Sequence, residues 1–380
     1  MKKIVFVTGT RADFGKLKAL IQAVHDHPDY EYTIFVTGMH LLYRYGFTVD
    51  EVRKAGFSNI YTFMNQVHGE PMEMVLANTI KGLSRYMHEV VPDMLIVHGD
   101  RVEALAGAIT GALKNILVGH IEGGEISGTV DELIRHAVSK MSHIHFVSNQ
   151  QAADRLRQLG ESGKSIYVIG SPDIDIMLSD QLPSIERVKE YYEIAYEEYG
   201  VVLYHPVTTE QYEQRRNAEV LAKALLESNM NYVVIHPNND TGSDDIMAAF
   251  RAFEGNERFR IFPSMRFEYF ITLMKNSSFI IGNSSAGVRE APVLAIPSIN
   301  LGTRQNNRFR YRTILDTEIK KEAIHRTISQ VAEMSDLKPS NFFGHGKSVE
   351  NFMNALQNQK IWKVEKQKQF LDILVNKQEL

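Results

Sequence analysis

The sequence predicts an α/β protein built from two doubly wound domains in tandem. Two observations lead to this prediction: a length of 380 residues, and short apolar runs that alternate with longer amphipathic stretches in both halves of the chain. A chain of this length exceeds what one hydrophobic core usually supports, so two domains are expected. The alternation is typical of a parallel sheet covered by helices. A content of 44% hydrophobic and 23% charged residues indicates a chain that folds throughout.

Short apolar runs mark the expected strands, and each run ends in a polar or glycine-containing segment. In the first half the runs are Lys3–Val7, Tyr32–Val36, Met94–Val97, Ile116–His120, Ile144–Val147 and Tyr167–Ile169. In the second half they are Val201–Tyr204, Tyr232–Ile235, Phe259–Phe262, Phe279–Ile281 and Ser298–Leu301. Similar patterns in the two halves predict one parallel sheet in each domain.

The domain boundary is expected near residue 172, where a Gly-Ser-Pro segment follows the sixth predicted strand. The first domain then covers residues 1–172 and the second covers 173–356. Apolar side chains alternate with Lys and Gln at helical spacing in Asn351–Val375. An amphipathic helix needs a surface to cover, so a C-terminal helix at about 357–380 is expected to cross back to the first domain.

Charge and composition exclude several classes of function. A net charge of -4 argues against a nucleic-acid or membrane surface, and the absence of cysteine excludes disulfides, thiolate metal sites and cysteine nucleophiles. The apolar run after the N-terminal Met-Lys-Lys is too short for a signal peptide, and no apolar stretch approaches the roughly 20 residues of a membrane span. These features predict a cytoplasmic protein that binds neither nucleic acid nor a membrane.

The first candidate for binding is the segment Thr8–Lys16, where a glycine-bearing turn opens into a helix. It is not a P-loop, because five residues separate its glycines and Leu17 stands where Ser or Thr would hold magnesium. A helix N-terminus with Arg11 and Lys16 still suits a phosphate. The alternative is that both cations are simply solvated at the start of a helix.

Carboxylates follow the next strands, and the carboxyl ends of parallel strands share one edge of the sheet. Asp100 follows one strand and Glu122 follows the next, although Asp100 could instead cap a helix. Gly123 and Gly124 would leave room for a ligand to approach the backbone. Asp131, four residues before Arg135, is a third candidate, with a surface ion pair as its alternative.

A metal site is not expected. His120 and Glu122 fall on one strand face, but no third ligand has suitable spacing.

The strand ends of the second half carry hydroxyl, amide, histidine and arginine groups rather than clustered carboxylates. We expect Gly282–Gly287 to open a helix and present hydroxyls and backbone N–H groups to a diphosphate, with Glu290 accepting from ribose hydroxyls. A simple helix cap and a buried, satisfied histidine are the alternatives. The candidates are His205, Asn239, Ser284, Ser285, Gly287, Glu290 and Arg308.

These segments together resemble the UDP-N-acetylglucosamine 2-epimerase family, which has the GT-B fold of two Rossmann-like domains. The resemblance spans nearly the whole chain. It rests on the order and strand-end positions of Gly9–Arg11 with Lys16, Gly99–Arg101, His120–Glu125, Asp131 with Ile134–His136, His205–Pro206 and Gly282–Gly287.

Three departures from the non-hydrolysing bacterial epimerases match the hydrolysing branch of sialic-acid biosynthesis. Ala12-Asp13, Gly123–Glu125 and Pro206–Thr209 stand where those enzymes have Pro-Glu, Ala-Gly-Leu and Arg-Arg-Glu.

The resemblance implies a role for each candidate residue. The catalytic set is Asp100, Glu122, Asp131 and His205 with Arg135, and the residues that bind the UDP-sugar are Arg11, Lys16, Asn239, Ser284, Ser285, Gly287, Glu290 and Arg308. It also implies a homodimer, and we expect neither a cofactor nor a metal ion.

The hypothesis for the reaction is elimination followed by hydration. No carbonyl group acidifies the C2–H bond of a hexosamine, so a good leaving group at C1, such as UDP, makes elimination feasible. Water would then add to the 2-acetamidoglucal to give N-acetylmannosamine. Four alternatives remain: a hydrolysing epimerase acting on a UDP-2,4-diacetamido-trideoxyhexose, a reversible epimerase that keeps UDP, a glycosyltransferase of the same fold, and a sensor without turnover.

Overall fold

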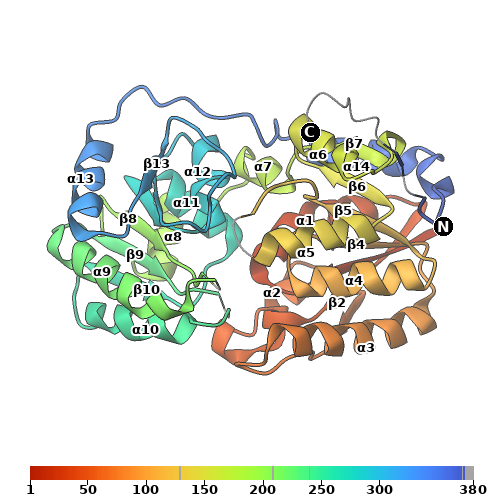
Figure 1. The fold of residues 1–380 in the computed structure, drawn as a ribbon, viewed down its shortest axis with the longest axis horizontal. Helices are drawn as coiled ribbons and strands as arrows, with labels where there is room; N and C mark the ends of the chain where they lie inside the picture. The colour runs from red at the N-terminus through yellow and green to blue at the C-terminus, as the bar shows by residue number, and fades with distance from the viewer. Residues whose placement is uncertain (128–129, 208, 239, 370, 373–380) are drawn as a thin grey trace.

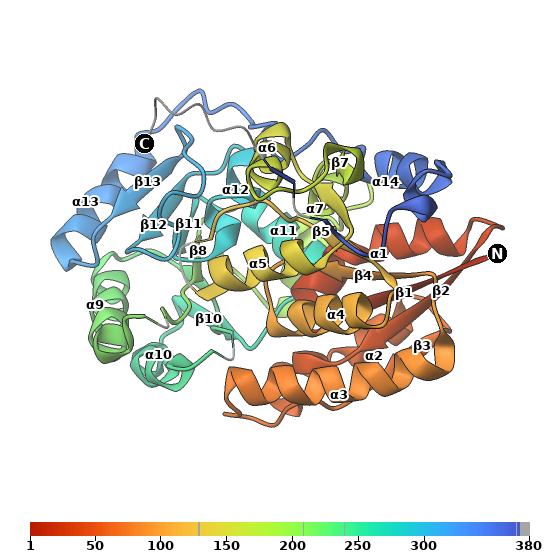
Figure 2. The same cartoon turned by 45° about the vertical axis from the view of Figure 1, so that its right-hand side comes forward.

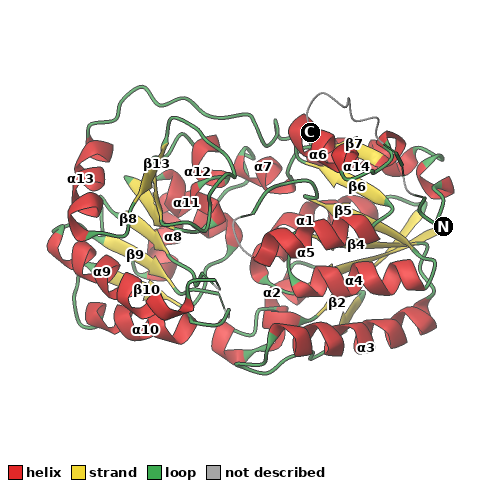
Figure 3. Ribbon diagram, in the orientation of Figure 1, coloured by secondary structure: helices red, strands yellow, loops and turns green. Residues whose placement is uncertain are grey.

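The structure is a computed structural model that describes residues 1–127, 130–207, 209–238, 240–369 and 371–372. Two lobes lie side by side along the long axis of the molecule (Figure 1), and each contains a parallel sheet. Figure 3 shows the same arrangement by type of element, with helices on both sides of the strands in each lobe. The predicted fold class, two doubly wound α/β domains, is confirmed.

The first sheet has the strand order β3-β2-β1-β4-β5-β6-β7, and all its neighbouring strands are parallel. Its strands are β1 (Lys2–Thr8), β2 (Tyr30–Val36), β3 (Ile60–Thr62), β4 (Met94–His98), β5 (Leu117–Ile121), β6 (Ile144–Val147) and β7 (Ile166–Val168). The helices of this half are α1 (Arg11–His25), α2 (Val49–Lys54), α3 (Met72–Val90), α4 (Val102–Leu113), α5 (Val130–Met141), α6 (Gln150–Gln158) and α7 (Pro172–Met177).

The second sheet has the order β10-β9-β8-β11-β12-β13 and is also parallel. Its strands are β8 (Gly200–Leu203), β9 (Tyr232–Ile235), β10 (Phe259–Phe262), β11 (Phe279–Gly282), β12 (Ser298–Leu301) and β13 (Ile314–Thr317). The helices of this half are α8 (Ile185–Tyr192), α9 (Gln214–Glu227), α10 (Ser243–Phe250), α11 (Phe267–Lys275), α12 (Glu290–Val293), α13 (Lys321–Ala332) and α14 (Ser348–Gln357).

Apolar side chains cover both faces of each sheet. Along β1, Ile4 and Phe6 belong to one core cluster, whereas Val5 and Val7 belong to the cluster on the opposite face. A strand buried on both faces is apolar at every position, so it forms a continuous hydrophobic run in the sequence. This is why the central strands could be predicted. Among the described residues, no helix is long and apolar enough to span a bilayer.

The chain passes between the domains twice, and the two passages touch. The backbone N–H of Ser171 donates to the carbonyl of Phe343 over 2.8 Å. Gly170 and Gly344 both have positive φ, and a Cβ on Gly344 would lie 3.3 Å from the Cα of Gly170. The boundary near residue 172 stays a prediction, and it falls between β7, the last strand of the first sheet, and β8, the first strand of the second.

The C-terminal part returns to the first domain, but the predicted helix at about 357–380 is wrong in its bounds over the described residues. Residues 370 and 373–380 of that prediction lie outside the described residues. The returning helix is α14, and only a 3-10 turn, Ile361–Lys363, follows it within the described residues. Figure 2 shows α14 beside α1 of the first domain. Phe352 of α14 and Ile361 are fully buried in the core cluster that contains β1. Trp362, whose apolar side chain extended the helical pattern, packs at the edge of this cluster instead.

Candidate functional site

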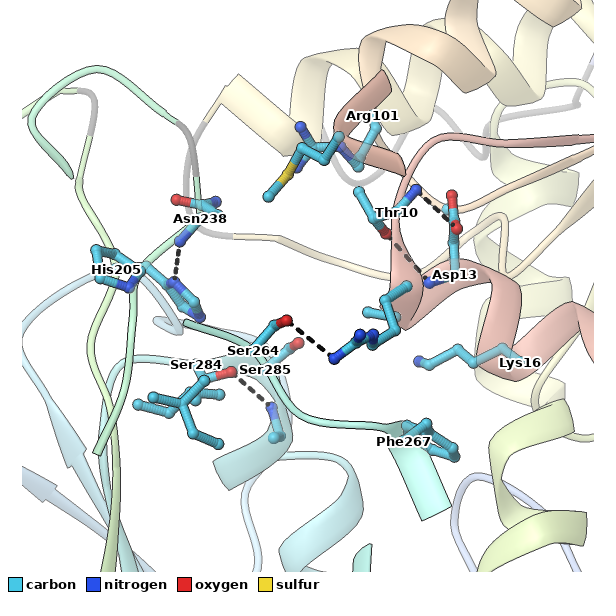
Figure 4. Close-up of a pocket in the computed structure, with 18 of the residues that line it drawn as sticks. Thr10, Asp13, Lys16, Arg101, His205, Asn238, Ser264, Phe267, Ser284 and Ser285 are labelled. Carbon is cyan, nitrogen blue, oxygen red and sulfur yellow. Dashed lines mark hydrogen bonds between the residues drawn. The ribbon is translucent and has the colours of Figure 1, made fainter. Parts of the chain in front are cut away.

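A cavity of about 360 Å³ lies between the two domains. It forms where the strand order of each sheet reverses, between β1 and β4 and between β8 and β11. At such a point the connections leave in opposite directions, which opens a crevice beyond the carboxyl ends of the strands. Figure 4 shows Lys16 and Arg101 on one side of the cavity, and His205, Ser284 and Ser285 on the other.

The structure brings most of the predicted site residues to this cavity. Those that line it are Arg11, Lys16, Asp100, Glu122, Asp131, Arg135, His205, Ser284, Ser285, Glu290 and Arg308. Gly287 is buried but is not part of the lining. A Cβ at this position would lie 2.5 Å from the Oγ of Ser298, so the glycine allows close packing between the segment after β11 and strand β12. Asn239 lies outside the described residues.

Helix α1 places two cations at the cavity. Thr10 caps the helix and forms a capping box with Asp13, which satisfies backbone N–H groups that have no partner within the helix. Arg11 donates from Nη1 to the Oγ of Ser264 in the second domain over 2.9 Å. The predicted glycine turn opening into a helix is confirmed here.

Lys16 is surrounded by carboxylates, so its charge is not free to bind a phosphate. Its Nζ is 3.4 Å from Glu122, 3.1 Å from Asp173 and 3.4 Å from Glu290. Burial alone would lower the pKa of Lys16, but these three carboxylates raise it above its ordinary value. Burial raises the pKa of Glu290, and the neighbouring Asp173 raises it further, although Lys16 opposes the shift.

Glu122 is contacted by several charged and hydroxyl groups. It follows β5 with φ of +63°, a left-handed conformation that is uncommon outside glycine. Arg289 donates to its Oε1 over 2.6 Å, Ser171 donates to the same oxygen, and His98 lies 3.2 Å from Oε2. Burial alone would raise the pKa of Glu122, but the charges of Arg289, Lys16 and His98 hold it well below its ordinary value. Glu122 is therefore a carboxylate at neutral pH.

Asp100 is paired with Arg135. The guanidinium donates to Oδ2 of Asp100 and also to the backbone carbonyl of Glu122 over 2.6 Å, so it ties two strand ends together. Ser127 donates to the same oxygen of Asp100 over 3.1 Å. Burial would raise the pKa of Asp100, but Arg135 and then Arg308 keep it below the ordinary range. Asp100 is thus also ionised.

Asp131 has a different partner from the one its spacing indicated. Its Oδ2 accepts from Nη2 of Arg304 over 3.4 Å, across the cavity. Arg135, four residues later on α5, is turned to Asp100 instead. The predicted surface alternative, an Asp131–Arg135 pair, does not form, because Arg135 is buried beneath the loop that carries Glu122.

His205 is held at the end of β8 as a neutral ring. The side-chain amide of Asn283 makes two hydrogen bonds to the backbone of His205. It accepts from the N–H over 2.6 Å and donates to the carbonyl over 2.8 Å. The Nδ1 atom accepts from the backbone N–H of Asn238 over 3.1 Å. Burial, with Arg304 and Arg101 nearby, lowers the pKa of His205 to about 3. A neutral ring that accepts at Nδ1 carries its proton on Nε2, which is left to donate.

The segment after β11 differs from the predicted helix. Residues Ser285–Gly287 form a single 3-10 turn, and α12 begins only at Glu290 and ends at Val293. The hydroxyl of Ser284 accepts from the N–H of Ala286 over 3.3 Å, so the expected side-chain cap is present. Gly282 has φ of +143°, and a Cβ there would lie 2.0 Å from the carbonyl oxygen of Leu203. Glycine is required because β8 and β11 approach closely at this point.

One sequence interpretation near Glu122 needs correction. Gly123 and Gly124 do not leave room for a ligand: a Cβ on Gly124 would lie 2.2 Å from the carbonyl oxygen of Ala152. His120 is a structural histidine, with Nε2 2.8 Å from the carbonyl of Gly99. Burial lowers its pKa to about 3. Within the described ranges no cluster of three or more potential metal ligands occurs.

Several residues of the site were not predicted from the sequence, among them His98, Asp173, Arg289 and Arg304. His98 is the last residue of β4 and Arg304 follows β12, so position at the end of a strand could have included both. Arg289 directly precedes Glu290 in the segment after β11, so the same rule could have included it too. Asp173 carries no local signal, because its partner Lys16 comes from a distant part of the chain.

Comparisons with known proteins agree with this geometry. A sequence model described as UDP-N-acetylglucosamine 2-epimerase matches residues 22–357. The chain is 49% identical to a UDP-N-acetylglucosamine 2-epimerase of Neisseria meningitidis serogroup B, over 98% of this chain and 100% of that protein. It is 32% identical to the UDP-N,N'-diacetylbacillosamine 2-epimerase (hydrolyzing) of Legionella pneumophila, over 94% and 96% of the two chains.

Among solved structures, the fold is similar to that of a UDP-GlcNAc 2-epimerase from Methanocaldococcus jannaschii in complex with UDP-GlcNAc and UDP. The TM-score is 0.78 at 19% identity, over 94% of this chain and 99% of that one. At this identity the likeness concerns the fold alone. The family match over most of the chain and the full-length relatives show that the chain belongs to the UDP-N-acetylglucosamine 2-epimerase family.

Proposed function

We propose that the protein is a hydrolysing 2-epimerase, which converts UDP-N-acetylglucosamine and water to N-acetylmannosamine and UDP. The observation that carries the proposal is the unequal chemistry of the two cavity walls. The first-domain wall presents three carboxylates that can exchange protons, Asp100, Glu122 and Asp131, together with the cations Arg11, Lys16, Arg101 and Arg135. The second-domain wall presents hydroxyls, a neutral histidine and the guanidinium groups of Arg289, Arg304 and Arg308, together with the carboxylates Asp240 and Glu290. A sugar whose ring must lose and regain a proton suits the first wall, and a nucleoside diphosphate suits the second.

The diphosphate is expected beside the segment after β11. Ser284 and Ser285 offer hydroxyls there, and Arg304 and Arg308 offer guanidinium groups on the same side of the cavity. Arginine binds phosphate through several N–H groups at once. The Nε2–H of His205 faces the same anion as an uncharged donor, and it is suited to stabilise the oxygen that leaves C1.

The reaction proceeds in two halves. First, a carboxylate takes the proton from C2 while the C1–O bond breaks, so that UDP leaves with the electron pair and 2-acetamidoglucal forms. Second, water adds across the double bond: a proton reaches C2 from the opposite face, and hydroxide is added at C1. Each proton transfer contributes about 10²- to 10⁴-fold.

Ionisation limits the roles of the carboxylates. Glu122 and Asp100 are both held as carboxylates, so each can accept a proton or stabilise positive charge at C1 in the first half. The acid of the second half then has to be a group that has taken up a proton, or another carboxyl of the cavity. Asp131, which lines the cavity and accepts from Arg304 across it, is proposed for this role.

Two observations support hydrolysis over reversible epimerisation. The Legionella pneumophila relative carries the word hydrolyzing in its name, and a Campylobacter jejuni relative that is 30% identical does so too. In addition, Glu125, which stands where the resemblance gives the non-hydrolysing enzymes leucine, has a defined partner in this cavity. It accepts from Nη1 of Arg289, and Ser148 donates to its other oxygen over 2.7 Å.

Incubation with UDP-N-acetylglucosamine alone tests the proposal. We expect equal amounts of UDP and free N-acetylmannosamine, separated by anion-exchange chromatography and identified by NMR. UDP-N-acetylmannosamine that accumulates without free hexosamine would show a reversible epimerase. A parallel incubation with UDP-N,N'-diacetylbacillosamine tests the second candidate, which the names of the two hydrolyzing relatives favour: faster turnover of that substrate contradicts the choice of UDP-N-acetylglucosamine.

A further inference from the structure

Arg289 belongs to the second domain, but its charged end contacts the first-domain loop that carries Glu122. It lies between the 3-10 turn after β11 and helix α12. Its Nη2 donates to Oε1 of Glu122 over 2.6 Å, and its Nη1 donates to Oε2 of Glu125. Only 1% of Arg289 is exposed, so bulk water does not screen these contacts.

The guanidinium group is fixed in orientation by two further neighbours. Its central carbon lies 4.7 Å from the ring centroid of Phe343, and Nη2 also donates to the Oγ of Ser171 over 2.6 Å. Ser171 and Phe343 are the residues at which the two interdomain passages meet. Arg289 is therefore held where the domains are covalently joined. Its two terminal nitrogens donate to two carboxylates of one loop.

Among the described residues, the other cations near Glu122 are engaged by further partners. Lys16 is shared with Asp173 and Glu290, at 3.1 and 3.4 Å. Arg135 donates to the backbone carbonyl of Glu122, and its side-chain partner is Asp100. The charged or titratable groups around Glu122 are Lys16 of α1, His98 of β4, Glu125 of its own loop, Arg135 of α5, Asp173 of α7, Arg289, and Glu290 of α12.

We propose that Arg289 is a positioning residue. It keeps Glu122 ionised and oriented toward the cavity, and it connects Glu122 to the domain that holds the nucleotide. It acts through Glu122, because both of its terminal nitrogens are engaged by side chains of Glu122, Glu125 and Ser171. The inference rests on the proposed function, in which Glu122 must face the sugar as a carboxylate. It explains why an arginine of the nucleotide domain is buried among first-domain acids.

Two variants, Arg289→Met and Arg289→Lys, test this role through the rate of UDP release as a function of pH. In Arg289→Met we expect kcat to fall by about 10²-fold or more and KM to stay within about three-fold, because the interaction acts in the transition state rather than in binding. Loss of the positive charge raises the pKa of Glu122, so the acid limb of the kcat profile moves to higher pH.

Arg289→Lys keeps the positive charge but loses the two terminal nitrogens of the guanidinium group. Its acid limb is expected to stay near that of the wild type, whereas its kcat falls, because one ammonium group cannot hold two carboxylates in a fixed geometry. Arg260→Met is the matched control: Arg260 pairs with Glu193 at the surface of the same domain, and its replacement should leave both kcat and the profile unchanged.

The role is overturned if KM rises while kcat is retained, or if Arg289→Met has a lowered kcat with the pH profile of the wild type. If Arg289→Met does not fold, as judged by circular dichroism, Arg289→Lys decides: a wild-type kcat contradicts the role and a reduced kcat at steady KM supports it. If the wild type interconverts UDP-sugars without releasing UDP, the variants are compared by the rate of that interconversion. Failure of the proposed hydrolysis is then distinguished from failure of the proposed role of Arg289.

Discussion

Replacement of Glu122 by glutamine is expected to lower kcat for UDP release by at least about 10³-fold while the affinity for UDP stays within about three-fold. Glutamine has nearly the same shape, and it can still accept from Arg289 and Ser171, but it has no negative charge and cannot take a proton from C2. UDP is expected to lie on the second-domain wall, away from Glu122, so its binding should persist. Steady-state kinetics and calorimetric titration with UDP measure the two quantities.

A control for Glu122→Gln is Glu219→Gln, which removes an exposed carboxylate of α9 that pairs with Arg215. This variant should keep wild-type kcat. A kcat of Glu122→Gln within ten-fold of the wild type would remove Glu122 from the chemistry. Loss of UDP binding with kcat retained at saturating substrate would make it a binding residue instead.

Replacement of Asp100 by asparagine is expected to lower kcat by about 10²- to 10⁴-fold, the range of a single proton-transfer or charge-stabilising group. Asparagine fits the same space between Ser127 and Arg135. It leaves the guanidinium of Arg135 without its counter-charge, so part of the effect could arise from a displaced arginine rather than from the lost carboxylate.

A double-mutant cycle separates these two contributions. If Asp100 faces the sugar itself, Asp100→Asn should cost more than Arg135→Met. If Asp100 only anchors Arg135, the two single variants and the double variant should share one residual kcat. This second outcome contradicts a direct role for Asp100. Asp154→Asn is the matched control, because Asp154 forms an exposed pair with Arg157 on α6.

Position at the end of a parallel strand is the rule that made much of the site predictable. Asp100 follows β4, Glu122 follows β5, His205 follows β8 and Ser284 follows β11, and all four line the cavity. Parallel strands bring their carboxyl ends to one edge whatever the loops do in detail, so strand prediction alone carries this information.

Partners of these residues could not be predicted in the same way. Spacing on one helix offered a surface pair of Asp131 with Arg135 as the alternative to a site role for Asp131. In the structure Asp131 pairs with Arg304 of the other domain, and Arg135 pairs with Asp100. Arg289 reaches Glu122 over a separation of 167 residues. Helix periodicity describes neighbours within one element, whereas these contacts depend on how two domains meet.

Edge strands and short helices were the other elements that were not predicted correctly from the sequence. Strands β3 and β13, at the edges of the two sheets, were not predicted, because most of their residues are exposed or half-buried and form no apolar run. The helix expected from Gly282 is only a 3-10 turn before α12. The amphipathic pattern through Asn351–Val375 overestimated the last helix, since Ile361 and Trp362 pack on the first domain from a 3-10 turn rather than from a longer helix.

The most direct test of the account is the isotopic composition of the products formed from UDP-N-acetylglucosamine in D₂O enriched in ¹⁸O. Elimination followed by hydration predicts free N-acetylmannosamine with deuterium at C2, and UDP without ¹⁸O, because the bond that breaks joins C1 to the phosphate oxygen. NMR and mass spectrometry read both labels from one reaction. Hydrogen retained at C2, or ¹⁸O found in UDP, would contradict the account.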